Sequence, residues 1–150
     1  MKTASAALLI LVLRVAPVWA VLGQYESSVS LDERALHGAD RQEAHPGYRL
    51  HQITASDGSV VREYVSPAGL VFGVAWQSPR MPNLTQLLGS SITELQVTLQ
   101  SRTPGIPSRA PLIVQTPKLV FLSGGHLRSF HGYAYVPGLV PAGVSPEVVQ

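Results

Sequence analysis

Two turn signals separate three strand-like segments in the middle of the chain and limit it to a narrow range of folds. Asp57-Gly58 is a two-residue hairpin signal, and Pro67-Ala68-Gly69 marks the next turn. The flanking segments 48–54, 60–65 and 70–76 are rich in β-branched, aromatic and apolar residues. Because short turns join antiparallel neighbours, the pattern predicts a three-stranded meander. Its third strand is apolar on both faces and is therefore expected to be central.

A stripe of leucine and isoleucine follows with helical spacing. The apolar residues recur three or four positions apart along 84–100, after the suitable N-cap Asn83 and before the breaker Thr103-Pro104-Gly105. Gly89 lies inside this stripe, where glycine weakens a helix, so we expect a close neighbour at its backbone. The spacing predicts one long amphipathic helix.

The remaining segments complete the expected fold. Short strand candidates at 112–115 and 119–122 precede the turn Ser123-Gly124-Gly125, and 126–136 alternates as a long strand. Ser145-Pro146-Glu147 has the pattern of a helix start. The predicted class is α+β: a three-stranded meander, one long amphipathic helix and a second β-hairpin form an antiparallel sheet with the helix on one face.

Alternation divides each long strand into a face with small residues and a face with large ones. The small residues are Gly73, Ala75, Gly132 and Ala134. The large rings on the opposite faces are those of Trp76, Tyr133 and Tyr135. We expect the helix to pack over the small residues, which leaves the rings to be covered by the N-terminal arm, the C-terminal tail, a second subunit or a ligand. A bulge at Gly73 would exchange the faces of its strand.

Residues 1–20 have the pattern of a secretory signal peptide. A basic residue, Lys2, precedes a short apolar run, and Val18-Trp19-Ala20 has small residues where a signal peptidase cleaves. An uncleaved anchor is the alternative, because Arg14 interrupts the apolar region. The predicted organisation is a signal peptide over 1–20, a polar N-terminal arm with a short helix over 21–47, and one α+β domain over 48–150. Once the signal is cleaved, no transmembrane segment is expected.

Charge and composition exclude several classes of function. Lys2 and Arg14 both lie in the leader, which leaves nine of the 11 cationic side chains against nine acidic ones, so nucleic acid is not expected as a partner. The absence of cysteine excludes disulfides, thiolate metal sites and a cysteine nucleophile. The glycines form no dinucleotide or phosphate loop, so no cofactor is expected.

The histidines suggest two kinds of chemistry, a metal site and hydrolysis. His126 and His131 lie an odd number of positions apart on one strand, which puts them on opposite faces, so no metal site is predicted. Ser123 near His126, with Glu63 or Asp57 as the orienting carboxylate, is the best available triad. Only nearness in sequence supports that triad, and a turn serine before two glycines is the simpler interpretation. No catalytic residue is therefore assigned.

The candidate binding residues fall into charged and aromatic groups. Arg62, Glu63 and Arg128 either pair across neighbouring strands and set the register or contact a partner. The rings of Trp76, Tyr133 and Tyr135 belong either to the core or to an aromatic binding surface. The full set of candidate binding residues is Arg62, Glu63, Trp76, His126, Arg128, His131, Tyr133 and Tyr135.

Two stretches resemble a known family. Val61-Arg62-Glu63-Tyr64-Val65-Ser66-Pro67-Ala68-Gly69, followed by 71–76, and the stretch from Ser123-Gly124-Gly125-His126 to Pro137 are similar to those of bacterial secreted proteins identified as domain of unknown function 2844. The resemblance covers 21–150 and implies export to the bacterial periplasm or the extracellular space. It brings no activity, ligand or catalytic residue.

These observations lead to three expectations of function. The first is a non-enzymatic, exported module that binds a partner protein or a small ligand, or associates with the envelope, through its aromatic sheet face or an edge strand. The second is a small hydrolase that uses His126 or His131. The third is a purely structural envelope protein.

Overall fold

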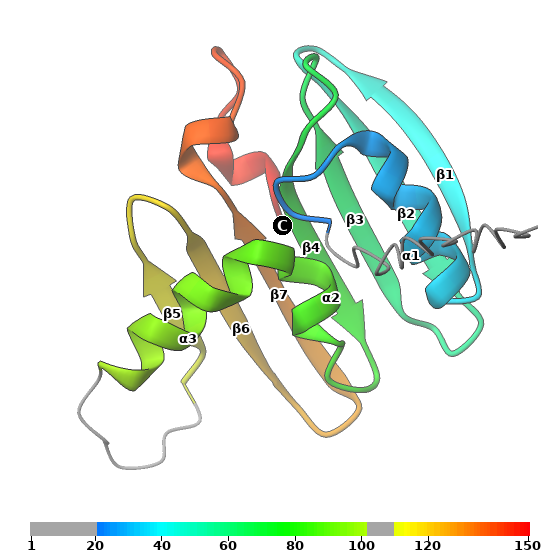
Figure 1. Ribbon diagram of the computed structural model, residues 1–150. Helices are drawn as coiled ribbons and strands as arrows, with labels where there is room; N and C mark the ends of the chain where they lie inside the picture. The colour runs from blue at the N-terminus through cyan, green and yellow to red at the C-terminus, as the bar shows by residue number, and fades with distance from the viewer. Residues whose placement is uncertain (1–20, 102–109) are drawn as a thin grey trace, which may run out of the picture.

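The chain forms one antiparallel sheet of seven strands in the order β1-β2-β3-β4-β7-β6-β5 (Figure 1). The computed structural model describes residues 21–101 and 110–150. The strands are β1 (Gly38–His45), β2 (Tyr48–Ala55), β3 (Val60–Val65), β4 (Val71–Ser78), β5 (Leu112–Gln115), β6 (Val120–His126) and β7 (Ser129–Tyr135). The α-helices are α1 (Val29–Ala35), α2 (Leu84–Leu88) and α3 (Ile92–Gln100). The 3-10 turns are η1 (Glu26–Ser28), η2 (Gly89–Ser91), η3 (Pro137–Leu139) and η4 (Pro146–Val148). The predicted signal peptide and the helix end expected at 103–105 lie outside the described residues.

The predicted arrangement of a three-stranded meander, one long helix and a second hairpin is wrong. Within 21–47, which was expected to be a polar arm with a short helix, α1 precedes β1, and β1 pairs with β2 along its whole length. This strand was missed because it lies at the edge of the sheet and its side chains are half-buried or exposed. An edge strand of this kind carries no apolar alternation to reveal it. At the opposite end of the strand order, beyond β4, the strands β7, β6 and β5 form a second group of three.

The predicted helix over 84–100 is divided into α2 and α3 with η2 between them. Gly89 has a φ of 54° and a ψ of −129°, which no helix contains and which residues other than glycine rarely adopt. The glycine therefore ends α2 and turns the chain into α3. A leucine stripe with the correct spacing is interrupted because the backbone geometry at one residue overrides the side-chain pattern.

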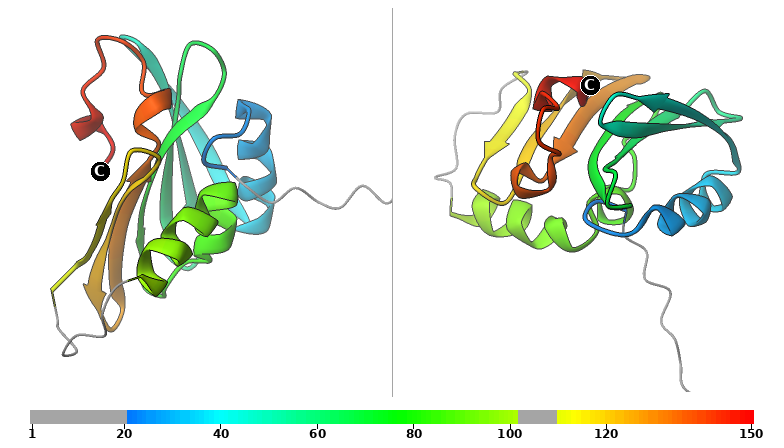
Figure 2. Two further views of the ribbon diagram at one scale, coloured as in Figure 1. Left: turned by 60° about the vertical axis from the view of Figure 1, so that its left-hand side comes forward. Right: turned by 90° about the horizontal axis from the view of Figure 1, so that it is seen from above.

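All three α-helices lie on one face of the sheet, and the C-terminal segment with η3 and η4 lies on the other (Figure 2). The main core fills the space between the helices and the sheet, where the largest buried side chains include Leu87, Leu88, Trp76 and Phe121. A smaller cluster on the opposite face contains Tyr64, Phe72, Ala75 and Val149. The C-terminal segment, which we call the tail, thus contributes the apolar side chain of Val149 to cover this second face of the sheet.

The expectation that Trp76 lies opposite the helices is also wrong. The register between β3 and β4 shifts, since Tyr64 pairs with Gly73 whereas Val65 pairs with Val71. Gly73 faces the tail, where an added Cβ would lie 2.6 Å from a methyl group of Val149. On the helix side, the ring of Trp76 packs over the glycine at position 132 of β7, its direct partner across the strands. A large ring is accommodated by a glycine on the neighbouring strand, so small residues need not gather on one face.

The other small and large residues are distributed as follows. Gly132 and Ala134 of β7 lie on the helix side, as expected from the sequence. Ala75 lies on the tail side with Gly73, against the expectation. Tyr133 and Tyr135 also pack against the tail-side cluster. The three large rings therefore do not share a face.

Candidate functional site

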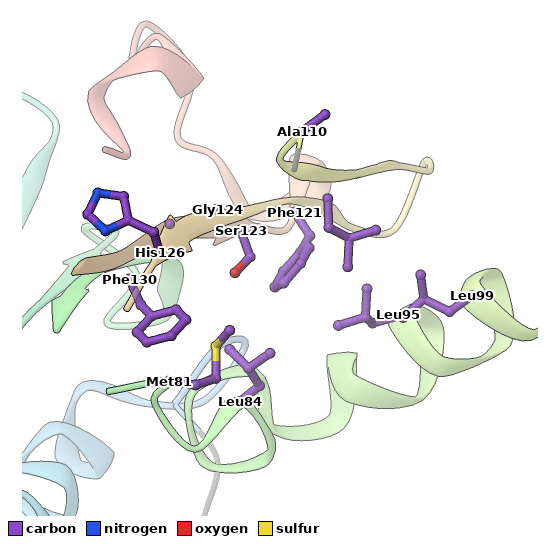
Figure 3. Close-up of a pocket in the computed structure, with 12 residues that line it drawn as sticks. Met81, Leu84, Leu95, Leu99, Ala110, Phe121, Ser123, Gly124, His126 and Phe130 are labelled. Atoms are coloured by element: carbon purple, nitrogen blue, oxygen red, sulfur yellow. The ribbon is translucent and has the colours of Figure 1, made fainter. Parts of the chain in front are cut away.

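A cavity of about 880 Å³ lies between α2–α3 and the β5–β7 part of the sheet (Figure 3). We call it the helix–sheet cavity, and its lining residues are Met81, Leu84, Leu95, Leu99, Ala110, Leu112, Phe121, Ser123, Gly124, Gly125, His126 and Phe130. No Asp, Glu, Lys or Arg is among these lining residues. An apolar cavity of this size, with few polar groups, has the properties of a small-molecule site.

The apolar wall of the cavity follows from the two periodicities of the chain. Leu95 and Leu99 lie one turn apart on α3 and therefore project from the same face of the helix. Phe121 and Ser123 are two residues apart on β6 and point to the same side of the sheet. The change from a phenylalanine to a serine and then to glycine along β6 removes side-chain volume, which helps to leave the space open.

Ser123 is the buried polar group of this cavity. Its residue is only 7% exposed, and its hydroxyl group points into the cavity (Figure 3). Among the described residues, the hydroxyl oxygen has no hydrogen-bond partner. A serine hydroxyl can both donate and accept, so it is available to a bound molecule.

A second cavity of about 210 Å³, which we call the indole cavity, adjoins the first. Met81 lines both cavities. The ring of Trp76 lines the indole cavity, and its centroid lies 5.9 Å from that of Phe121, which lines the larger one. Trp76 is 2% exposed, and its Nε1 has no hydrogen-bond partner within the described part of the chain. A buried N–H without a partner is rare in proteins and calls for an explanation.

Several of the other polar groups that line the indole cavity are paired. The hydroxyl oxygens of Ser59 and Ser78 lie 2.9 Å apart. The backbone N–H of Ser59 donates to Oδ1 of Asp57 over 2.9 Å, and hydrogen bonds from this serine hold the pKa of the Asp57 carboxyl below its ordinary value. Arg80 also lines the cavity and lowers the same pKa by its charge. Among the described residues, the indole N–H of Trp76 is thus a buried donor without a partner, whereas Arg80 is exposed.

A pair of buried carboxyl groups lies between α1 and β3, and neither of them lines the helix–sheet cavity or the indole cavity. Glu63 is fully buried and Asp32 is 2% exposed, and the two carboxyl groups lie close enough to influence each other's pKa. Among the described residues, neither oxygen of Glu63 and not Oδ2 of Asp32 has a hydrogen-bond partner. Nε2 of Gln86 also donates to Oδ1 of Asp32 over 2.7 Å. Burial, followed by the neighbouring Asp32, raises the pKa of Glu63 well above its ordinary value. Burial raises the pKa of Asp32 as well, so both carboxyl groups keep their protons to a higher pH than exposed carboxyl groups do.

His51 connects two further carboxylates on the same side of the sheet. Its Nδ1 lies 2.8 Å from Oδ2 of Asp40, and its Nε2 lies 3.0 Å from Oε1 of Glu26. Glu26 also accepts hydrogen bonds from Arg49, and these bonds are the main reason why its pKa is lowered. Within residues 21–101 and 110–150, no group of three or more His, Cys, Asp or Glu side chains is arranged to hold a metal ion.

The charged residues predicted as a row are not brought together. Glu63 points into the helix-side core, whereas Nε of its neighbour Arg62 donates to Oε1 of Gln52 over 3.3 Å. Arg128 is exposed in the turn between β6 and β7, with a φ of 66°. No ion pair among the described residues joins any two of the three.

The residues considered for hydrolysis are also separate. The ring of His126 points away from the leucines of α3 (Figure 3), and its Nδ1 lies 3.2 Å from the carbonyl oxygen of Leu127. In the described part of the chain, no hydrogen bond joins Ser123 to His126, and Glu63 is enclosed beside another carboxyl group. His131 is exposed on the other face of the sheet, near Gly124. The geometry therefore does not assemble the triad that the sequence suggested.

The predicted aromatic surface is reduced to two rings. Tyr133 and Tyr135 stack with their centroids 6.5 Å apart, and together with the tail they line a cavity of about 160 Å³. Burial raises the pKa of Tyr135. Trp76 lies on the opposite face beneath the helices, so it does not share a binding surface with them.

The sequence analysis did not identify the leucines and phenylalanines that line the helix–sheet cavity. A stripe of leucines on a helix normally belongs to the hydrophobic core, so nothing in the pattern indicated a cavity. Asp32 and Asp40 were likewise not identified as partners of buried groups. One signal was present: Glu63 lies between Val61 and Val65 at a position whose alternation points inward. An acid at such a position indicates a buried carboxyl group that must find a partner or a proton.

Comparisons with known proteins complete the description of the chain. No curated protein and no solved structure matches it. In the described residues, no helix is both long and apolar enough to cross a membrane. The model of the family described as protein of unknown function (DUF2844) matches residues 18–149 and confirms the resemblance seen in the sequence. Because this match spans nearly the whole chain, the protein belongs to that family.

Proposed function

We propose that the protein is an exported, non-enzymatic binding protein that holds a small and mainly apolar ligand in the helix–sheet cavity. The observation that carries this proposal is a cavity of about 880 Å³ whose lining is apolar except for one buried, unpaired serine hydroxyl and the exposed His126. Export to the bacterial periplasm or the extracellular space is supported by the leader pattern over 1–20.

The lining also limits the chemistry of the ligand. A charged group placed among leucine and phenylalanine side chains would lose its hydration without gaining a counter-ion. An apolar body gains about 25 cal/mol for each Å² removed from water, before the costs of association are subtracted. A neutral ligand with one or two oxygen atoms therefore fits this cavity best.

Binding of a neutral fluorescent probe, N-phenyl-1-naphthylamine, tests the proposal. We expect the probe to bind the exported chain, and the double variant Leu95→Trp/Leu99→Trp to bind it about tenfold more weakly, because both indoles occupy the cavity. The matched control is Val97→Trp/Leu127→Trp, whose positions are 58% and 85% exposed and do not line the cavity. It should bind like the wild type.

Two results would contradict the proposal. Equal affinities of the two double variants would show that the probe binds elsewhere. No binding of the probe to the wild type would favour the structural envelope protein instead. Circular dichroism of each variant separates loss of binding from loss of the fold.

A further inference from the structure

We propose that the ligand of the helix–sheet cavity is a ketone or an ester whose carbonyl oxygen accepts a hydrogen bond from the hydroxyl group of Ser123. The apolar body of this ligand lies between the sheet and the leucine side chains of α2 and α3. This inference rests on the proposed function and specifies the chemical class of the ligand.

The first argument is that the hydroxyl group of Ser123 is both unpaired and open to the cavity. Ser123 is 7% exposed and lines the cavity, and its hydroxyl oxygen points into it (Figure 3). Within residues 21–101 and 110–150, no group is hydrogen-bonded to this oxygen. A buried hydroxyl group without a partner has lost its hydration, and a ligand that bonds to it recovers that free energy.

The second argument is the position of this hydroxyl group in the cavity wall. Ser123 lies on the same side of β6 as the fully buried Phe121, and Leu95, which is 3% exposed, lines the cavity from α3. Met81 and His126, in contrast, are exposed. The unpaired group thus belongs to the buried part of the wall. A ligand that binds it must therefore carry an oxygen atom inside the protein, among apolar side chains, and not only at an end that stays in water.

The third argument favours a carbonyl group over a hydroxyl group or a secondary amide. Apart from Ser123 and His126, the lining residues have no strong hydrogen-bonding side chain. If a ligand hydroxyl group accepts the bond from Ser123, its own hydrogen lacks a side-chain acceptor, as does the N–H of an amide. If the ligand donates instead, the hydrogen of Ser123 stays unpaired. A carbonyl oxygen carries no hydrogen, so one bond leaves no buried donor without a partner, and such donors are rare in proteins.

Two probes that differ in one group test this inference together with the variant Ser123→Ala. Benzophenone has a carbonyl group where diphenylmethane has a methylene group. We expect the variant to bind benzophenone about fivefold more weakly than the wild type does, and diphenylmethane within about twofold, because only the ketone loses a hydrogen bond. The difference between the two factors isolates the contact between hydroxyl and carbonyl groups. Ser56→Ala is the matched control, since Ser56 is exposed and does not line the cavity.

An isotope-edited infrared spectrum of benzophenone, labelled with ¹³C at the carbonyl group, reports the hydrogen bond without any substitution. Bound to the wild type, the carbonyl stretching band should lie at a lower wavenumber than in hexane, because a hydrogen bond weakens the C=O bond. In Ser123→Ala the band should return toward its position in hexane. Ser123→Ala removes a group without a partner, so we expect it to keep the fold, which circular dichroism checks.

Three results would overturn the inference while leaving the proposed function intact. The first is an equal effect of Ser123→Ala on the two probes, and the second is a carbonyl band of the bound ketone that matches the band in hexane. The third is tighter binding of benzhydrol, which has a hydroxyl group in place of the carbonyl group, because it would show that the cavity selects an alcohol. Binding of none of the three probes to the wild type would contradict the proposed function as well.

Discussion

Gly132→Ala should lower the free energy of unfolding by about 3 kcal/mol or more, which would make it one of the most damaging single-methyl additions in the chain. An added Cβ would overlap the carbonyl oxygen of Leu122 on β6 and the ring of Trp76 on β4. Gly132 is paired on both sides, with Trp76 and with Ser123, so neither neighbouring strand can move without breaking its ladder. Overlap with backbone atoms in the middle of a sheet cannot be relieved by a change of rotamer.

Urea unfolding followed by circular dichroism measures this effect. Gly138→Ala is the matched control, because Gly138 is exposed and an added Cβ there meets no atom within 4 Å. The control should stay within about 0.5 kcal/mol of the wild type. Similar unfolding midpoints for the two variants would show that the contact between β4 and β7 is looser than described.

Glu63→Gln should make the protein more stable near pH 8 by about 1–3 kcal/mol, because it removes a fully buried carboxyl group that has no N–H donor. The glutamine amide can donate to Oδ2 of Asp32, which has no partner among the described residues. Replacement by an isosteric amide therefore satisfies a second buried atom and needs no change in packing.

The sign of the pH dependence follows from the direction of the pKa shift. The pKa of Glu63 is raised in the folded state above its ordinary value of 4.5, so the folded protein binds more protons than the unfolded chain in the range between the two values. The stabilisation is complete below the ordinary value and is lost as the pH rises through the raised one. The wild type should therefore lose stability with rising pH, by up to about 1.4 kcal/mol per pH unit for one proton.

Unfolding midpoints between about pH 5 and pH 8 check this prediction, and the variant should show a much smaller slope than the wild type. Glu147→Gln serves as the control, since Glu147 is exposed and lies outside the pair. Glu26 has the opposite effect, because its pKa is lowered, and its contribution is lost only as the pH falls below 4.5. Identical slopes for the wild type and Glu63→Gln would contradict the assignment of the proton to this pair.

Most local signals predicted local structure correctly, but the turn predicted at Ser123-Gly124-Gly125 is wrong. These residues belong to β6, the turn lies at Leu127 and Arg128, and His126 is therefore on β6 and not on the strand of His131. The Asp57-Gly58 turn joins β2 to β3, and Asn83 caps α2 by accepting a hydrogen bond from the N–H of Gln86. Both features depend on residues within a few positions of each other, so the sequence shows them directly. Other failures involved partners distant in the chain. β1 was missed because a polar edge strand is recognised only by its pairing with β2.

The chain order of six of the seven strands, the equal numbers of cationic and acidic side chains in residues 21–150 and the absence of cysteine chemistry can all be derived from the residues, because each depends on composition or on short spacing. The side of the sheet on which Trp76 lies depends on the register between β4 and β7, which pairs Trp76 with a glycine far along the chain. The helix–sheet cavity likewise exists only where α2–α3 and β5–β7 meet. Such features arise from packing between distant segments, which no local pattern encodes.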